Sequence, residues 1–246
     1  MADALRLYAL KGVVTGAAEG IGEAVARTFA KHGAEVLAVD SLESRIDTAF
    51  SRVRGITAAA VDNAAESASQ ELAGAVRERL DGLDILVNNI PQLSDFAAES
   101  GGSLQPWMDR IMATTTAVLP FLEQSPAGRI INIGALRSSF GRRGEAEFEA
   151  AGKALADLTA SQAAEYGRFG ITANYIQPGA IMTPSSRAVF DADKSFRDWC
   201  IARSAARRLG DPVDVAKVVL FLASDDAVFV SGTGIAADGG ILPGGG

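Results

Sequence analysis

The sequence predicts an α/β protein built on a parallel β-sheet with helices on both faces. Short apolar runs rich in β-branched residues alternate along the chain with longer amphipathic runs. The chain has 246 residues, 48% of them apolar and 22% charged, which is typical of one large globular domain. A glycine-rich turn follows the first apolar run, as expected where a buried strand passes into a helix.

Each predicted element follows from one of these runs. The predicted strands are Leu10–Val14, Glu35–Val39, Thr57–Val61, Leu83–Val87, Arg129–Ile133, Thr172–Ile176 and Thr233–Ala236. The predicted helices cover residues 20–31, 66–80, 103–123, 145–168 and 211–223. Because helices separate the strands, βαβ crossovers and hence parallel pairing are expected. We expect a single domain over residues 1–246, with an irregular substrate flap at about 180–208.

Composition argues against several classes of partner. The net charge of −7 does not favour binding to nucleic acid or to an anionic membrane. Cys200 is the only cysteine and the chain has one histidine, so we expect neither an intrachain disulfide nor a metal site. The first residues do not read as a signal peptide, and no apolar run is long enough for a membrane helix. These features predict a cytoplasmic protein.

The glycine turn indicates a dinucleotide site. Gly16, Gly20 and Gly22 lie between the strand 10–14 and the helix 20–31. Glycines let the backbone approach a pyrophosphate, and the helix N-terminus offers N–H groups and a positive dipole end. The spacing is G-x-x-x-G-x-G rather than G-x-G-x-x-G, so the strand–turn–helix context carries the interpretation.

The residue that ends the second strand predicts which nucleotide binds. Asp40 lies 18 residues beyond Gly22, where a carboxylate can accept hydrogen bonds from the adenosine ribose hydroxyls. It would repel a 2′-phosphate, and Glu19 in the turn adds to this preference. We therefore predict NAD(H) rather than NADP(H). The alternative is that Asp40 merely ends a strand and caps the next helix.

The run T-G-x-x-x-G-I-G over Thr15–Gly22 resembles the short-chain dehydrogenase/reductase family, and the likeness extends over nearly the whole chain. Further similar segments are VDN at Asp62, DILVNN at Asp84–Asn89, GRIINI at Gly128–Ile133, AAEYGRFGITANYIQPG at Ala163–Gly179, RRLGDPVDVAKVVLFLASD and VSGTGIAADGG. The resemblance implies a Rossmann-type, doubly wound seven-stranded sheet. It also implies a tetramer assembled through the two long helices after the fourth and fifth strands. We expect a homotetramer, and the alternative is a mixed tetramer with an active relative.

The resemblance also assigns roles around the cofactor. Asp62 would contact the adenine, Asn88 would brace the sheet, and Ile181 with Thr183 would hold the nicotinamide amide. The predicted cofactor residues are Thr15, Gly16, Glu19, Gly20, Ile21, Gly22, Asp40, Asp62, Asn88, Pro178, Gly179, Ile181 and Thr183. In this chain Ile90–Pro91 replace the usual Ala-Gly, which adds bulk and removes an N–H close to the adenosine half.

The catalytic residues of the family are Asn, Ser, Tyr and Lys. The tyrosine gives a proton to the carbonyl oxygen as hydride arrives, and the lysine one helical turn away lowers the phenol pKa from about 10. Alignment on GITANYIQPG puts the tyrosine position at Phe148 and the lysine position at Gly152. The serine position is then Ala135 and the asparagine position Thr115. All four are substituted, so the catalytic residues of this chain are unknown.

A shift of one residue does not restore the acid. Lys153 is rotated about 100° around the helix from position 152. Residues 136–165 contain no tyrosine, and Tyr166 follows Phe148 by eighteen residues. We interpret Lys153 as a surface partner of Glu149 and Phe148 as an apolar wall of the cleft.

Two of the substituted positions, Gly152 and Thr115, each allow two interpretations. Gly152 could make room for the cofactor or for a neighbouring side chain. Thr115 retains a hydroxyl that could bind a relay water, or it is simply a polar helix residue.

Basic residues near the expected cleft have two readings. Arg142 and Arg143 follow Ser138 and Ser139, and three more arginines lie on the predicted flap. The flap arginines are Arg203, Arg207 and Arg208. They could bind an anionic substrate, although charged loop residues are commonly just solvated.

The leading hypothesis is an NAD(H)-dependent oxidoreductase of unknown carbonyl or alcohol substrate, with Glu147, Glu149 or Ser138 as a replacement proton donor. Loss of the general acid should slow reduction by about 10²–10⁴-fold. The alternative is a non-catalytic NAD-binding subunit, sensor or partner of an active relative. A lyase or isomerase on the same scaffold is a third class. Relatives that became dehalogenases rebuilt the glycine turn and kept a Ser/Tyr pair, whereas this chain has the reverse, which argues against that route.

Overall fold

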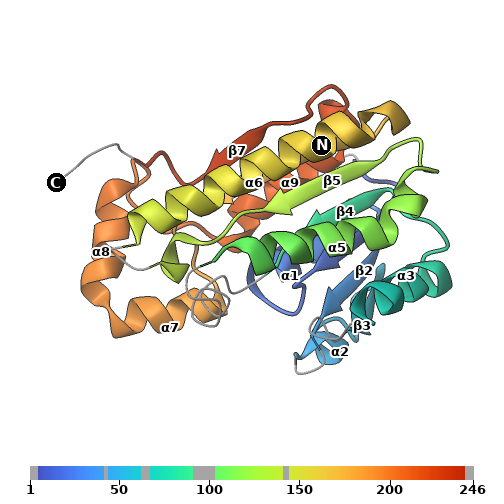
Figure 1. The fold of residues 1–246 in the computed structure, drawn as a ribbon. Helices are drawn as coiled ribbons and strands as arrows, with labels where there is room; N and C mark the ends of the chain where they lie inside the picture. The colour runs from blue at the N-terminus through green and yellow to red at the C-terminus, as the bar shows by residue number, and fades with distance from the viewer. Residues whose placement is uncertain (1–4, 42–43, 62–66, 91–102, 141–143, 242–246) are drawn as a thin grey trace.

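The computed structural model describes residues 5–41, 44–61, 67–90, 103–140 and 144–241. These residues contain a seven-stranded sheet with the order β3-β2-β1-β4-β5-β6-β7 (Figure 1). The strands are β1 Lys11–Thr15, β2 Glu35–Asp40, β3 Ile56–Ala60, β4 Ile85–Asn88, β5 Arg129–Ile133, β6 Thr172–Pro178 and β7 Gly234–Ala237. All neighbouring strands pair in parallel. The predicted doubly wound α/β fold is confirmed.

The helices cover both faces of this sheet. They are α1 Gly20–Lys31, α2 Ile46–Ala49, α3 Ala68–Arg79, α5 Gln105–Leu122, α6 Glu145–Tyr166, α7 Pro184–Ala192, α8 Lys194–Arg203 and α9 Pro212–Ala223. Helices α1 and α9 share a core with one face of the sheet. Helices α3, α5 and α6 share the core of the other face, and Figure 1 shows α5 and α6 running alongside one another there.

The alternation of side chains along each strand supplies both cores. Val13 packs toward α3 and α5, and its neighbour Val14 packs toward α1 and α9. Both valines are fully buried. Successive strand residues point to opposite faces, so a strand buried on both sides reads as a continuous apolar run. This explains why the short apolar runs were visible in the sequence.

The predicted boundaries agree with the structure to within one or two residues for most elements. The fourth strand begins at Ile85 rather than Leu83, and β6 continues two residues further, to Pro178. Leu83 is buried, but ladder pairing to β1 and β5 starts only at Ile85.

The expectation that residues 180–208 are irregular is wrong, because this segment holds α7 and α8, while its role as a substrate flap stays a prediction. Thr183 caps α7 through a reciprocal capping box with Ser186, and Pro184 occupies the first turn. The Asp193 side chain accepts a hydrogen bond from the Phe196 N–H and so caps α8. The helices are too short for a clear apolar period, whereas their caps were readable.

The carboxyl ends of the strands lie at one edge of the sheet and position the candidate site. Thr15, Asp40, Asn88 and Pro178 are each the last residue of their strand. In open parallel sheets ligands bind at this edge, where the strand order reverses direction. Helices α7 and α8 lie beyond this edge, next to the start of α6 (Figure 1).

Candidate functional site

The glycine turn between β1 and α1 has a backbone that requires glycine. Gly16 and Gly20 have φ values of 56° and 59°, in the left-handed region. A Cβ atom on Gly22 would lie 2.0 Å from the carbonyl oxygen of Gly16. The turn therefore presents bare backbone next to the helix, as a phosphate cradle needs.

The N-terminus of α1 is not closed by a side chain. Glu19 is the N-cap residue, is exposed, and makes no side-chain capping hydrogen bond. The first-turn N–H groups are therefore available to an anion, and the helix dipole adds to the attraction. Ile21 is 4% exposed and packs into the core on the α1 side of the sheet, so it anchors the helix beneath the turn.

Asp40 is fixed against this turn. One carboxylate oxygen accepts the Ala18 N–H at 2.7 Å, and the other accepts the Ser41 N–H at 2.7 Å. The N-cap of the next helix, α2, is Arg45, so the alternative that Asp40 caps that helix is wrong. Each carboxylate oxygen keeps a further acceptor site, which the two hydroxyls of a ribose could use.

Asn89, the residue directly after β4, ties the turn to the sheet. The side-chain amide of Asn89 donates to the Gly16 carbonyl at 2.9 Å, and the Asn89 N–H donates to Thr15 Oγ1 at 3.0 Å. Asn89 was not among the predicted site residues, although it stands in the quoted DILVNN segment. Ile90, expected to crowd the adenosine half, is partly buried against the cluster around Trp107 and Ile111. Pro91 lies outside the described residues.

Asn88 belongs to a buried polar network rather than to the open cleft. Its amide donates to Asn132 Oδ1 at 2.9 Å and to Thr115 Oγ1 at 3.0 Å. Asn132 in turn donates to Thr159 and Gln162 on α6. The network therefore links β4, β5, α5 and α6.

Thr115 is part of this network and faces the core. It is fully buried, and its hydroxyl also donates to the Ile111 carbonyl at 2.8 Å. The hydroxyl is thus engaged as both donor and acceptor. This geometry supports the polar-helix reading of Thr115 and not the relay-water reading.

The segment after β6 closes over the turn. Thr183 approaches to 3.2 Å from a Cβ built on Gly20, while its hydroxyl accepts the Ser186 N–H at 3.1 Å. Ile181 is 1% exposed, in the core shared with α1 and α9. Pro178 ends β6, and the Gly179 N–H donates to the Ala237 carbonyl. Asp62, Arg142 and Arg143, singled out from the sequence, lie outside the described residues.

Two of the four substituted catalytic positions, Ala135 and Gly152, contact one side chain, Gln177 of β6. The Gln177 amide donates to the Ala135 carbonyl at 3.1 Å. Its Oε1 lies 3.1 Å from a Cβ built on Gly152. This oxygen is buried, and it has no hydrogen-bond partner among the described residues. Gly152 thus makes room for a neighbouring side chain, one of the two readings left open above.

Phe148 lines a cavity of about 260 Å³ one helical turn before Gly152. The cavity lies between the start of α6, helix α8 and the segments after β5, β6 and β7. Its lining residues are Arg137, Glu145, Phe148, Glu149, Ala180, Trp199, Cys200, Arg203, Ser204, Arg208, Asp238 and Ile241. The interpretation of Phe148 as a wall of the cleft agrees with this placement.

The cavity is rich in arginine and aromatic rings. Arg137 is 4% exposed, in the short 3₁₀ turn Arg137–Ser139 after β5. Its guanidinium carbon lies 5.5 Å from the ring centre of Phe148 and 5.1 Å from that of Trp199. Burial lowers the pKa of Arg137 from its usual value. Arg137 was not singled out from the sequence because its neighbours come from α6 and α8.

The remaining charged candidates are less well placed. Lys153 pairs with Asp157 at 2.9 Å on the exposed side of α6, so the predicted partner Glu149 is wrong. Glu147 is exposed, Ser138 is 7% exposed, and only Glu149 of the three suggested donors lines the cavity.

The three tyrosines of the chain lie elsewhere. Tyr8 is 73% exposed, and Tyr166 is buried at the far end of α6. Tyr175 lies on β6 with its ring over Gly234 of β7. None of them lines the cavity.

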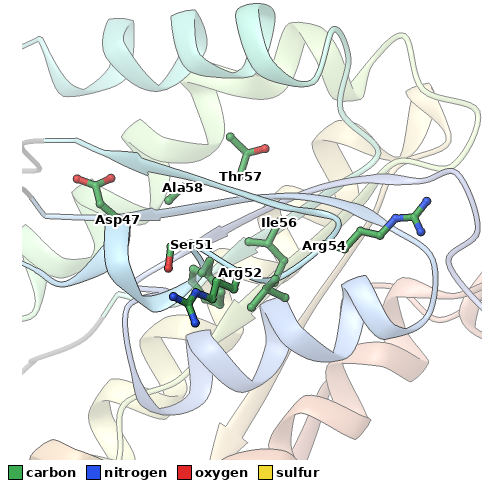
Figure 2. Close-up of a pocket in the computed structure, with 9 residues that line it drawn as sticks. Asp47, Ser51, Arg52, Arg54, Ile56, Thr57 and Ala58 are labelled. Carbon is green, nitrogen blue, oxygen red and sulfur yellow. The ribbon is translucent and has the colours of Figure 1, made fainter.

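A more open hollow of about 440 Å³ lies beside α2 and β3 (Figure 2). Most of its wall comes from residues 50–54, which precede β3 and so lie near the opposite edge of the sheet from Asp40. Figure 2 shows the guanidinium groups of Arg52 and Arg54 pointing in different directions. This hollow has no converging polar groups and is not part of the candidate site.

No helix in the described ranges is long and apolar enough to cross a membrane. No group of three or more His, Cys, Asp or Glu side chains in the same ranges is arranged to hold a metal ion.

Comparison with known proteins gives consistent matches over nearly the whole chain. A family model described as enoyl-(acyl carrier protein) reductase, of the short-chain alcohol dehydrogenase type, matches residues 16–242. The 3-oxoacyl-(acyl-carrier-protein) reductase FabG of Vibrio cholerae is 31% identical over 236 residues, covering 93% of this chain and 96% of the relative. The gluconate 5-dehydrogenase of Gluconobacter oxydans is 31% identical over 251 residues, covering 97% of each.

A solved structure has the same fold. The crystal structure of a putative gluconate dehydrogenase from Agrobacterium tumefaciens superposes with a TM-score of 0.82 at 29% sequence identity. The match covers 98% of both chains. The fold is therefore one that this solved structure shares.

Proposed function

Because the chain belongs to the short-chain dehydrogenase/reductase family, we propose that it binds NAD(H) at the glycine turn and acts as an oxidoreductase with its usual catalytic residues replaced. The observation that carries the cofactor assignment is the fixed pairing of Asp40 with the turn. A bound nicotinamide would supply or accept a hydride. Gly16, Gly20 and the first N–H groups of α1 would hold the pyrophosphate.

NAD(H) is favoured over NADP(H) by charge. The Asp40 carboxylate ends β2 beside the turn, and Glu19 is a second acidic side chain there. A 2′-phosphate at this position would bring like charges together, which is unfavourable by several kcal/mol. A ribose with two free hydroxyls would instead donate to Asp40.

Titration of protein with NADH and with NADPH, followed by cofactor fluorescence, tests this proposal. We expect NADH to bind at least about tenfold more tightly, and the Asp40→Asn variant to lose most of this preference. Asp47→Asn, which removes an exposed carboxylate from α2, is the matched control and should retain it. Tighter binding of NADPH by the wild-type protein would overturn the assignment of Asp40.

Ordinary carbonyl reduction by this site should be very weak. The side chains of Ala135 and Phe148 are apolar, and Gly152 has no side chain. These three positions therefore offer no side-chain O–H, N–H or charge to a carbonyl oxygen. General acids contribute about 10²–10⁴-fold to such reactions. If another residue supplies the proton, Glu149 is the best placed of the three suggested, because it lines the cavity.

A second candidate function is a non-catalytic NAD-binding subunit, sensor or partner of an active relative. The position of Gln177 favours it, because its uncharged amide occupies the space beside Gly152 where a lysine side chain would lie. Turnover of several substrate molecules per second on a panel of aldehydes and ketones would exclude this candidate.

We further propose a cytoplasmic homotetramer that uses α5 and α6, with a mixed tetramer as the alternative. The support is family membership and the two long helices that follow β4 and β5. Light scattering on purified protein should give the mass of four chains, and a monomer would refute the assembly.

A further inference from the structure

The innermost cation of the cavity is Arg137. Its side chain enters from the turn after β5, and its backbone N–H donates to the Gly179 carbonyl. Rings from α6 and α8 surround the guanidinium. Their centres lie 5.5 Å (Phe148), 5.8 Å (Phe196) and 5.1 Å (Trp199) from its central carbon. The cation is therefore held rigidly by aromatic faces rather than extended into water.

Three acidic side chains line the cavity: Glu145, Glu149 and Asp238. Glu145 pairs with Arg203 at 2.9 Å. An oxygen of Asp238 accepts the Gly240 N–H at 2.8 Å, and Glu149 is exposed. Arg208, on the rim, pairs with Asp214 at 2.6 Å.

Arg137 remains charged in this setting. Burial lowers the pKa of Arg137, but a guanidinium does not deprotonate in proteins. The planar guanidinium suits a carboxylate, which it can bind through two parallel hydrogen bonds.

We propose that this cavity binds a small organic carboxylate, with the carboxylate on Arg137 and the apolar part of the ligand against Phe148 and Trp199. The volume of about 260 Å³ suits a molecule of metabolite size rather than a long chain. Phe148 stands at the family's tyrosine position, so the ligand would lie at the substrate end of the cleft. In assigning a substrate class, the inference rests on the proposed function.

Trp199 makes the test direct, because it lines the cavity and one other tryptophan, Trp107, is fully buried elsewhere. Benzoate and its neutral analogue benzamide are titrated into cofactor-free protein, with tryptophan fluorescence as the readout. We expect benzoate to bind at least about tenfold more tightly, as charge-assisted hydrogen bonds predict. In the Arg137→Met variant this preference should disappear.

The matched control is Arg197→Met, which removes one positive charge outside the cavity from α8, the helix that carries Trp199. It should retain the benzoate preference within about twofold, since exposed charges are screened by solvent. Equal binding of the two probes by wild-type protein, no saturable response to either, or a preference that survives in Arg137→Met would each overturn the inference.

Arg137 is buried, so its replacement could disturb folding. Thermal melts followed by circular dichroism show whether Arg137→Met is folded. If it is not, the Arg137→Lys variant tests the inference instead. Lysine keeps the charge without the planar fork, so benzoate binding should weaken several-fold while benzamide binding is unchanged. An Arg137→Lys variant that binds benzoate as the wild type does would refute the assignment.

Failure of the proposed function is distinguishable from failure of this inference. The same samples are titrated with NADH in the absence of benzoate. Benzoate binding without NADH binding would contradict the proposed cofactor site alone. NADH binding without a benzoate preference would contradict the carboxylate pocket alone.

Discussion

At the residue scale, the central feature is the packing of Gln177 against Gly152. Gly152 on α6 has no side chain, and the amide of Gln177 on β6 fills the volume above it. The same amide donates a hydrogen bond to the Ala135 carbonyl, so two of the substituted positions pack against one side chain. Restoring a lysine at 152 alone would bring its Cβ to 3.1 Å from Gln177 Oε1, which must then move.

The glycine turn gives a second prediction at this scale. Gly22→Ala places a methyl group 2.0 Å from the Gly16 carbonyl oxygen, so the turn must open. We expect a loss of about 1–3 kcal/mol in the free energy of unfolding, as for overpacked cores, and weaker NADH binding. Urea unfolding and NADH titration measure the two effects.

Gly74→Ala is the control for that change. A Cβ on Gly74 meets nothing within 4 Å, and the residue lies inside α3. Alanine there should stabilise the protein by about 0.5–1 kcal/mol and leave NADH binding unchanged. A Gly22→Ala protein as stable as wild type would show that the turn geometry is wrong.

Cys200 gives a pH-dependent prediction. Burial raises the pKa of its thiol to about 11, although Arg137 and Arg203 act in the opposite direction. At pH 8 the thiolate fraction is then more than about a hundredfold below that of a free cysteine. A thiol reagent should therefore react slowly with folded protein at pH 8 and faster as the pH rises towards 11.

The same shift has a consequence for stability. A pKa raised above its unfolded value of about 8.5 contributes stability below that pH, and the contribution is lost as the pH rises towards the folded pKa. In the labelling experiment, urea-unfolded protein is the control, and its Cys200 thiol should react with the reagent at the rate of an ordinary cysteine. Rapid labelling of folded protein at pH 8 would contradict the buried position of Cys200.

At the scale of elements, the cavity depends on α8, because Trp199, Cys200 and Arg203 all come from it. The Asp193 carboxylate caps this helix by accepting the Phe196 N–H at 2.9 Å. Asp193→Ala should lower the free energy of unfolding by about 0.5–2 kcal/mol and weaken benzoate binding. Chemical unfolding and the fluorescence titration measure these two effects.

Asp191→Ala is the matched control for the cap. Asp191 is exposed near the C-terminal end of α7, where a negative charge is not favoured by the helix dipole. Its removal should leave stability and benzoate binding unchanged or slightly improved. If both variants lose benzoate binding equally, the cap is not what positions α8.

At the scale of the whole molecule, the sequence predicted the sheet well because its central strands β1, β4 and β5 are buried on both faces. Val13 and Val14 go to opposite cores, so the run Leu10–Val14 stands out from its surroundings. Helices α7 and α8 were missed because their apolar residues, such as Phe190 and Phe196, recur over too few turns.

The site was predictable only where one local segment makes it. The spacing of Gly16, Gly20 and Gly22 identifies them in the sequence as a nucleotide-binding turn. Asp40 is identified by its position at the end of a predicted strand. Arg137 and Gln177 do not, because their surroundings come from residues far along the chain. Gln177 meets Ala135 across 42 residues, and Arg137 meets Trp199 from a different helix.

The central claim is that the chain binds NAD(H) at the glycine turn, next to a catalytic site that lacks the family's proton donor. Its most direct test is the rate of NADH oxidation by a variant carrying Ala135→Ser, Phe148→Tyr, Gly152→Lys and Gln177→Ala. The fourth change makes room for the lysine, and Thr115 is left alone because it belongs to the buried network. The control carries the same changes but keeps Phe148.

With a panel of aldehydes, ketones and 2-oxo acids, the four-residue variant should exceed both wild type and control by at least about 10²-fold. A variant that folds and binds NADH, yet reduces nothing faster than the wild type, would contradict the claim.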